Sequence, residues 1–174
     1  MSSLLSRWLP RRAEATVDAS APADTLSPLS IAPAGLVGEF LCEDQIDTAK
    51  LLSLFKQAFL EVEVASDTRL RVRAESGTRV SVAVDANRQL IQFIVAYGLR
   101  EDAPMAEKLA LCNRVNDQVI FVRFSVADPT TLVSDYSLPF EGGVTTAAIM
   151  GTLRRMARIT GQSIGEMDED KLVV

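Results

Sequence analysis

The chain has 174 residues, of which 48% are hydrophobic and 24% are charged, as is typical of one folded domain with flanking segments. Its net charge of −5, from 18 Lys and Arg against 23 Asp and Glu, argues against binding of nucleic acid through bulk charge. The sequence has no histidine, which excludes a Ser-His-Asp or Cys-His relay and histidine-ligated zinc within this chain. The two cysteines can form at most one disulfide and are too few for a four-thiolate metal site. We therefore expect no catalytic residues, no metal, no cofactor and no nucleic-acid partner.

No segment has the pattern of a secretory signal or a membrane helix. A secretory signal places basic residues before its apolar run. The arginines near the start of this chain instead interrupt or follow the apolar residues. Apolar runs elsewhere are shorter than the roughly 20 residues that a membrane helix needs. We expect a cytoplasmic protein.

Residues 1–40 are rich in Pro, Ala and Ser and show no sustained helical or strand period. Such a stretch buries too little apolar area to offset the entropy of ordering it, which predicts a flexible segment. Its start is different, because Leu4, Leu5, Trp8 and Leu9 recur at helical spacing beside arginines. This pattern indicates either a fraying end or a short amphipathic helix that docks on a partner or a membrane surface.

Residues 41–165 contain the periodic segments of a folded domain. Residues 45–61 carry one apolar stripe at three- and four-residue spacing, which predicts a helix. Alternating segments follow at 70–73 and 80–84, and a β-branched and aromatic run at 90–99. Separated by Gly and Asx turns, they predict an antiparallel three-strand meander.

A second helix is expected to begin at Pro104. Its apolar stripe consists of Met105, Leu109, Cys112 and Val115. The lysines of the first two helices, Lys108 among them, are expected to be solvated.

Two further strands, at 119–126 and 132–140, precede a third helix with Thr145 as its N-cap. Gly142 and Gly143, just before that helix, lack the spacing of a phosphate-binding loop. They are more typical of a junction that needs positive φ. The order α-β-β-β-α-β-β-α predicts a two-layer α+β sandwich, an antiparallel sheet with helices on one face.

Arg69, Arg71 and Arg73 alternate with apolar residues and therefore share one face of a predicted strand. On an open sheet face they could bind an acidic partner. The simpler interpretation is that they are charges on the wet side of the sheet.

The third helix has a basic flank formed by Arg154, Arg155 and Arg158. Residues 166–174 hold four acidic residues against one lysine and predict a solvated acidic tail that could screen this flank.

From residue 109 onward the sequence resembles the YbjN family, often described as bacterial sensory transduction regulators. The resemblance rests on residues 109–116 (LALCNRVN), on 121–124 entering a strand, on Asp128, and on 138–145 (LPFEGGVT) before the final helix. With the upstream helix and meander it covers about residues 41–165. It implies a fold like that of class I type III secretion chaperones, which are homodimers that hold extended partner segments, and it brings no catalytic residues.

We expect a non-enzymatic, chaperone-like or regulatory module that binds a protein segment on its sheet face or in a dimer groove, with Arg69, Arg71 and Arg73 tuning the choice of partner. An alternative is an adaptor that the Leu4–Leu5–Trp8–Leu9 segment tethers to a membrane surface or an assembly. A third hypothesis is a hydrolase that uses Asp85, Asp128 and Asp135. A homodimer through the third helix and last strands is also expected.

Overall fold

The structure, a computed structural model, describes residues 38–174. In chain order its elements are β1 (Phe40–Leu41), η1 (Glu43–Gln45), α1 (Thr48–Gln57), β2 (Glu61–Ser66), β3 (Arg69–Arg73), β4 (Arg79–Asp85), β5 (Leu90–Gly98), α2 (Met105–Gln118), β6 (Arg123–Asp128), β7 (Thr131–Pro139), β8 (Val144–Thr145) and α3 (Thr146–Met167). Six strands form one sheet in the order β2-β3-β4-β5-β7-β6, with every neighbouring pair antiparallel. The α+β class with an antiparallel sheet and three helices is confirmed.

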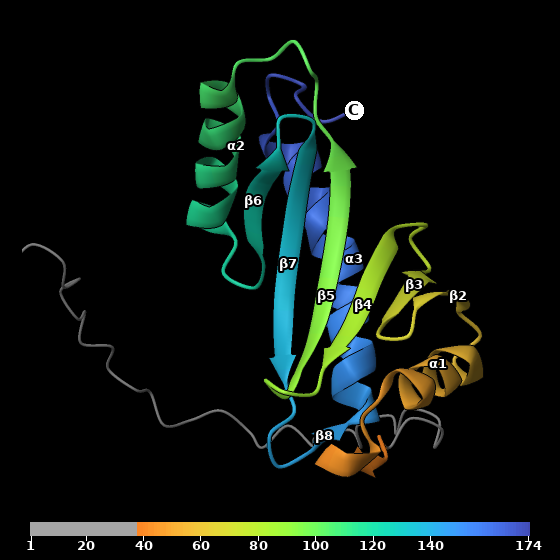
Figure 1. Cartoon of the computed structure of the whole chain (residues 1–174). Coiled ribbons are helices and arrows are strands. Elements are labelled where there is room, and N and C mark those ends of the chain that lie inside the picture. Colours follow the sequence, from red (N-terminus) through yellow and green to blue (C-terminus); the bar gives the residue numbers. More distant parts are fainter. Residues whose placement is uncertain (1–37) are drawn as a thin grey trace, which may run out of the picture. The chain divides into compact units, whose positions relative to one another are not determined.

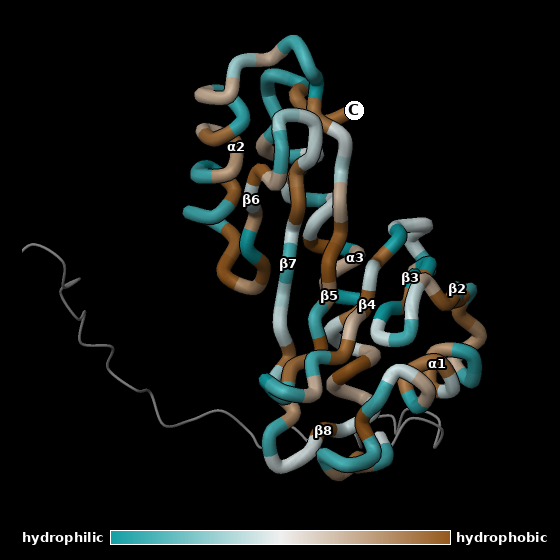
Figure 2. Tube along the Cα trace, in the orientation of Figure 1, coloured by the Kyte–Doolittle hydropathy of each residue, from teal (hydrophilic) through white to brown (hydrophobic). Residues whose placement is uncertain are grey.

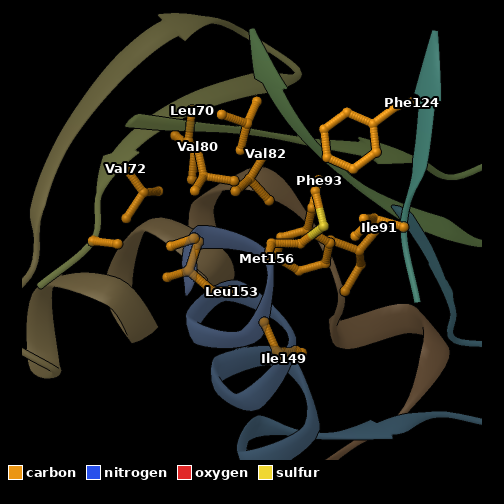
Figure 3. Close-up of a cluster of buried hydrophobic side chains, with 14 of the residues drawn as sticks. Leu70, Val72, Val80, Val82, Ile91, Phe93, Phe124, Ile149, Leu153 and Met156 are labelled. Carbon is orange, nitrogen blue, oxygen red and sulfur yellow. The ribbon is translucent and has the colours of Figure 1, made fainter. Parts of the chain in front are cut away.

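The core lies between one face of this sheet and the helices (Figure 1). Strand alternation turns Leu70 and Val72 of β3 inward while the arginines between them face outward. Across the inner face, the apolar side chains of β3, β4 and β5 pack against α3, which contributes Ile149, Leu153 and Met156 (Figure 3). Figure 2 shows the same alternation as bands of opposite hydropathy along the strands.

The first helix is shorter than its apolar stripe predicts, because α1 ends at Gln57. Phe59 has a φ of 59°, and the Leu60 and Phe59 N–H groups donate to the carbonyls of Phe55 and Lys56, both at 3.0 Å. These bonds form a Schellman-type helix end, which usually uses glycine in the left-handed position. The residues after it become β2, so four strands rather than three separate the first two helices.

The second helix is rotated from the predicted orientation. Met105 and Leu109 are 42% and 48% exposed, whereas Lys108, expected in solvent, is 1% exposed. The Lys108 ammonium donates to the Pro129 carbonyl oxygen at 2.7 Å and so ties α2 to the β6–β7 turn. Because a buried ammonium needs a hydrogen-bond acceptor, this carbonyl explains how the fold accommodates the charge.

The end of the chain is not the solvated tail that its acidity predicts. Asp168 accepts hydrogen bonds from the backbone N–H groups of Leu172 and Val173, each at 2.8 Å. Leu172 is 1% exposed, and Val173 forms a bridge with Leu99 beyond the end of β5. Asp168 therefore holds an apolar chain end against the domain.

Gly142 and Gly143 connect β7 to the β1–β8 pair with φ angles of 76° and 101°. A Cβ on Gly142 would meet open space, whereas one on Gly143 would overlap the Phe40 ring and the Leu41 carbonyl. Thr145 follows as the N-cap of α3, its side chain accepting from the Ala148 N–H at 3.1 Å.

Replacing each of these two glycines by alanine distinguishes the cost of positive φ from the cost of steric overlap. Gly142→Ala is expected to cost about 1–2 kcal/mol of unfolding free energy, because an L-residue disfavours positive φ. Gly143→Ala is expected to cost more, because its Cβ also overlaps β1. Thermal melts check the ranking, with Gly151→Ala in α3 as a control expected to gain about 0.5–1 kcal/mol. Equal melting temperatures for the two junction variants would contradict the packing argument.

The two free cysteines are expected to differ in reactivity. Cys42 is exposed and Cys112 is buried, and burial raises the pKa of the Cys112 thiol. Because the thiolate is the reactive form, a disulfide reagent at mildly alkaline pH should modify Cys42 quickly and Cys112 only as the domain opens. Mass spectrometry of partly labelled protein measures both rates, and equal rates would show that α2 does not protect Cys112.

Candidate protein-binding surface

One face of the six-stranded sheet has no helix over it within residues 38–174. The buried side chains of α1, α2 and α3 all join the core on the inner face. Figure 1 shows α3 behind the sheet and the opposite face uncovered in front. We call this uncovered surface the open face. It carries the outward side chains of the strands, among them Glu61, Glu63, Arg69, Arg71, Arg73, Arg79, Ser81, Ile94, Ala96, Arg123 and Asp135.

Arg69, Arg71 and Arg73 lie together on the exposed side of β3. Arg79 of β4 joins them, because it stands directly opposite Arg73 in the strand register. Sequence reasoning missed Arg79 because it lies one residue before the predicted strand at 80–84. Extending that alternation backwards by one residue would have placed it on the same face.

The four arginines differ in their partners. Arg73 lies 3.6 Å from a Glu61 carboxylate oxygen, and the Arg69 guanidinium donates to the Ser81 hydroxyl at 3.3 Å. Among the described residues, no carboxylate lies within 4.0 Å of Arg71 or Arg79. These two guanidinium groups therefore have donors available to a ligand.

The same arginines line a groove of about 430 Å³ on the open face. Glu61 and Glu63 of β2 stand at one wall, and Ile94 and Ala96 of β5 lie toward the middle of the sheet. Cationic groups above an apolar floor fit an extended segment that carries both acidic and apolar side chains.

The two edges of the sheet are protected differently. At β6, the Asn116 amide from α2 donates to the Phe124 carbonyl at 2.9 Å and accepts from the Phe124 N–H at 2.7 Å. The side chain of Asn116 thus replaces a neighbouring strand. At β2, the described residues form no backbone hydrogen bonds beyond the ladder with β3, and Val64 is 61% exposed. A bulge after Val64 is the main irregularity that discourages pairing at this edge.

The three aspartates of the hydrolase hypothesis do not form a site. Asp85 is the last residue of β4, paired with Leu90 at the start of β5. Asp128 lies at the β6–β7 turn beside the other end of β5, so about 26 Å of strand separates the two. Hydrogen bonds from the Thr130 N–H and hydroxyl lower the pKa of Asp128, and Asp135 pairs with Arg123 at 3.1 Å. The structure therefore corrects this hypothesis: the carboxylates serve turns and an ion pair.

The remaining features considered in the sequence are the N-terminal apolar segment, metal ligands and membrane helices. Leu4, Leu5, Trp8 and Leu9 lie outside the described residues. Within residues 38–174, no three His, Cys, Asp or Glu side chains gather as metal ligands. No helix in that range is both long and apolar enough to cross a membrane.

Comparison with known proteins places these features in a family. A family model for YbjN, described as "Putative bacterial sensory transduction regulator", matches residues 47–169. The structure is similar to YbjN from E. coli, described as "a putative transcription regulator", with a TM-score of 0.60 at 15% identity over 72% of this chain and 94% of that one. At such identity the likeness shows the fold. No curated protein matches the sequence.

Two type III secretion complexes are also similar, more distantly. The ExoU–SpcU complex of Pseudomonas aeruginosa gives a TM-score of 0.48 at 20% identity, over 68% of this chain and 98% of that one. The HopA1–SchA chaperone–effector complex gives a TM-score of 0.47 at 14% identity, over 67% of this chain and 88% of that one.

Because Asn116 caps the edge of β6, we expect its replacement to lower stability. Asn116→Ala removes both hydrogen bonds to the Phe124 backbone and should cost about 1–2 kcal/mol of unfolding free energy. Asn113→Ala, an exposed position on the same helix, is the matched control. Urea denaturation and light scattering of both variants measure stability and edge-to-edge aggregation. Indistinguishable midpoints would show that the amide does not hold the edge.

Proposed function

The chain belongs to the YbjN family, and from this premise we propose that it is a non-enzymatic interaction module, chaperone-like or regulatory, that binds an extended segment of another protein. The observation that carries the proposal is the open face, where Arg71 and Arg79 have donors without carboxylate partners above a groove with an apolar floor. The absence of histidine from the sequence and the dispersal of the aspartates support a role without catalysis.

In this mechanism the segment lies along the groove over β3 and β4. Its acidic side chains would accept hydrogen bonds from Arg71 and Arg79, and its apolar side chains would pack on Ile94 and Ala96. The neighbouring β2 edge offers backbone N–H and C=O groups to the part of the segment that runs past the groove. Charge on the arginines would govern the choice of partner and the association rate more than the affinity.

The other expectations stay predictions. A homodimer through the third helix and last strands is one of them; Met105 and Leu109 of α2, exposed about one turn apart, offer a second candidate surface. The cytoplasmic location is not tested by the structure.

Liposome flotation tests the alternative that the N-terminal apolar segment tethers the protein to a membrane surface. The full chain is compared with a variant in which Leu4, Leu5, Trp8 and Leu9 are replaced by Ser. Equal flotation of the two proteins would exclude a membrane tether at these residues.

Partner binding is expected to depend on Arg71 and Arg79, because Arg73 pairs with Glu61 and Arg69 donates to the Ser81 hydroxyl. The full chain, as bait in lysate of its native host at low salt, should lose its specific partner on Arg71→Ala/Arg79→Ala. The control Arg88→Ala/Arg100→Ala removes the same charge from two arginines that already pair with Asp85 and Asp102.

Quantitative mass spectrometry of the captured proteins measures the difference. Recovery of no partner above background by the wild-type chain would contradict the proposal. If both double variants lost the partner equally, the lower net charge would explain the loss, and the open face would not be the binding surface.

A further inference from the structure

Arginines without a carboxylate partner gather at two places. Six of the eleven described arginines lie within 4.0 Å of a carboxylate: Arg73, Arg88, Arg100, Arg114, Arg123 and Arg154. Of the five described arginines without one, three lie on the open face and two, Arg155 and Arg158, lie on α3. This second group belongs to no function described so far.

The three arginines of α3 lie within five consecutive residues of the helix. Arg154 and Arg158 are four residues apart, so they share a side of the helix, and like charges at this spacing destabilise a helix. A Glu75 carboxylate oxygen in the β3–β4 turn lies 3.2 Å from the Arg154 guanidinium and pairs with this arginine alone of the three. The Arg155 guanidinium lies over the Phe121 ring, 5.0 Å from its centroid. This cation–π contact needs no hydrogen-bond donor, and among the described residues Arg155 lies within 4.0 Å of no carboxylate.

These side chains line a pocket of about 440 Å³ between α3 and the β3–β4 turn. Gly151 contributes no side chain to it, and a Cβ there would meet nothing within 4 Å. The opposite wall is fixed, because the Thr78 hydroxyl in the turn donates to the Ala157 carbonyl at 3.2 Å. The pocket is therefore built by two elements that are bonded to each other.

The acidic end of the chain does not neutralise this pocket. Asp168 accepts from the backbone of Leu172 and Val173, and Asp170 lies 3.6 Å from Arg114. Glu166 accepts from Gln162 on its own helix at 2.8 Å. Among the described residues, Glu75 is the one carboxylate paired with this cluster.

We propose that the pocket between the β3–β4 turn and α3 is a second binding site, which takes the carboxylate side chains of an acidic partner segment. Arg155 and Arg158 donate to these carboxylates, and Arg154 stays fixed by Glu75. A peptide fits better than a nucleic acid, because the nearby Glu75 and the net charge of −5 oppose a continuous phosphate backbone. The inference rests on the proposed function in taking a protein segment as partner, but its residues lie apart from the open face.

Fluorescence anisotropy tests the site with a fluorescein-labelled peptide of alternating Glu and Val, the full chain and low salt. Arg155→Ser/Arg158→Ser is expected to weaken binding by about tenfold or more. Arg88→Ser/Arg100→Ser, which removes the same charge elsewhere, should change it by less than about threefold. A peptide of alternating Lys and Val should not bind.

Gly151→Glu gives a readout that loss of folding cannot imitate. The new carboxylate stands four residues before Arg155, the favourable orientation for a helical ion pair, and replaces a glycine inside a helix. The melting temperature should therefore rise while affinity for the acidic peptide falls. If the melting temperature and the affinity for the acidic peptide both rose, the proposal of a binding site in this pocket would be wrong.

The outcomes also separate this inference from the proposed function. If Arg71→Ala/Arg79→Ala weakens binding and the α3 variants do not, the second site is wrong and the open face stands. If the α3 variants alone weaken binding, the open face fails as the acidic-segment site and the pocket stands. Equal or tighter binding of single-stranded DNA at the same salt would overturn the assignment to a peptide.

Discussion

The structure depends on burial of one side of a single sheet. Alternation along β3, β4 and β5 sends Leu, Val, Ile and Phe side chains toward α3 and places charged or small side chains opposite them. Three helices on one side supply the core, so the other side needs no cover for stability. The open face is therefore a consequence of how the core is made, and packing of the core does not constrain its side chains.

Protection of the edges completes this arrangement. An exposed strand edge is a template for pairing, and most proteins shield it. Here Asn116 closes β6 with a side-chain amide, whereas β2 keeps its edge with only a bulge and two glutamates. Among the described strands, the edge left open to added backbone pairing is therefore β2, next to the arginines of β3. In the proposed mechanism one partner segment would reach both.

The sequence predicted the class of fold and the strands with clear alternation, because binary patterning follows burial on one face. It could not predict the end of α1, where Phe59 takes a conformation that glycine usually adopts. Val62, the residue after the predicted helix, continues its three- and four-residue apolar spacing and also suits a strand, and pairing with Val72 places it in β2.

Lys108 and the acidic end were misjudged for a related reason. Composition indicates solvent for a lysine or an aspartate, but specific acceptors and donors, the Pro129 carbonyl and the Leu172 and Val173 amides, hold them in the folded domain. The arginine face at 69–73 was visible in the alternation. The pocket on α3 was not, because the turn that forms its other wall lies 79 residues before the paired Arg154.

The β3–β4 hairpin has a consequence for how the two basic surfaces communicate. Arg73 and Arg79 form the last strand pair before its turn and lie on the open face, while Glu75 in the turn pairs with Arg154 of α3. In the two-site proposal, an occupant that displaced the hairpin on one side would also move the wall of the other site. Thermodynamic linkage would make such a coupling reciprocal, so that each occupant would change the affinity of the other site by the same factor.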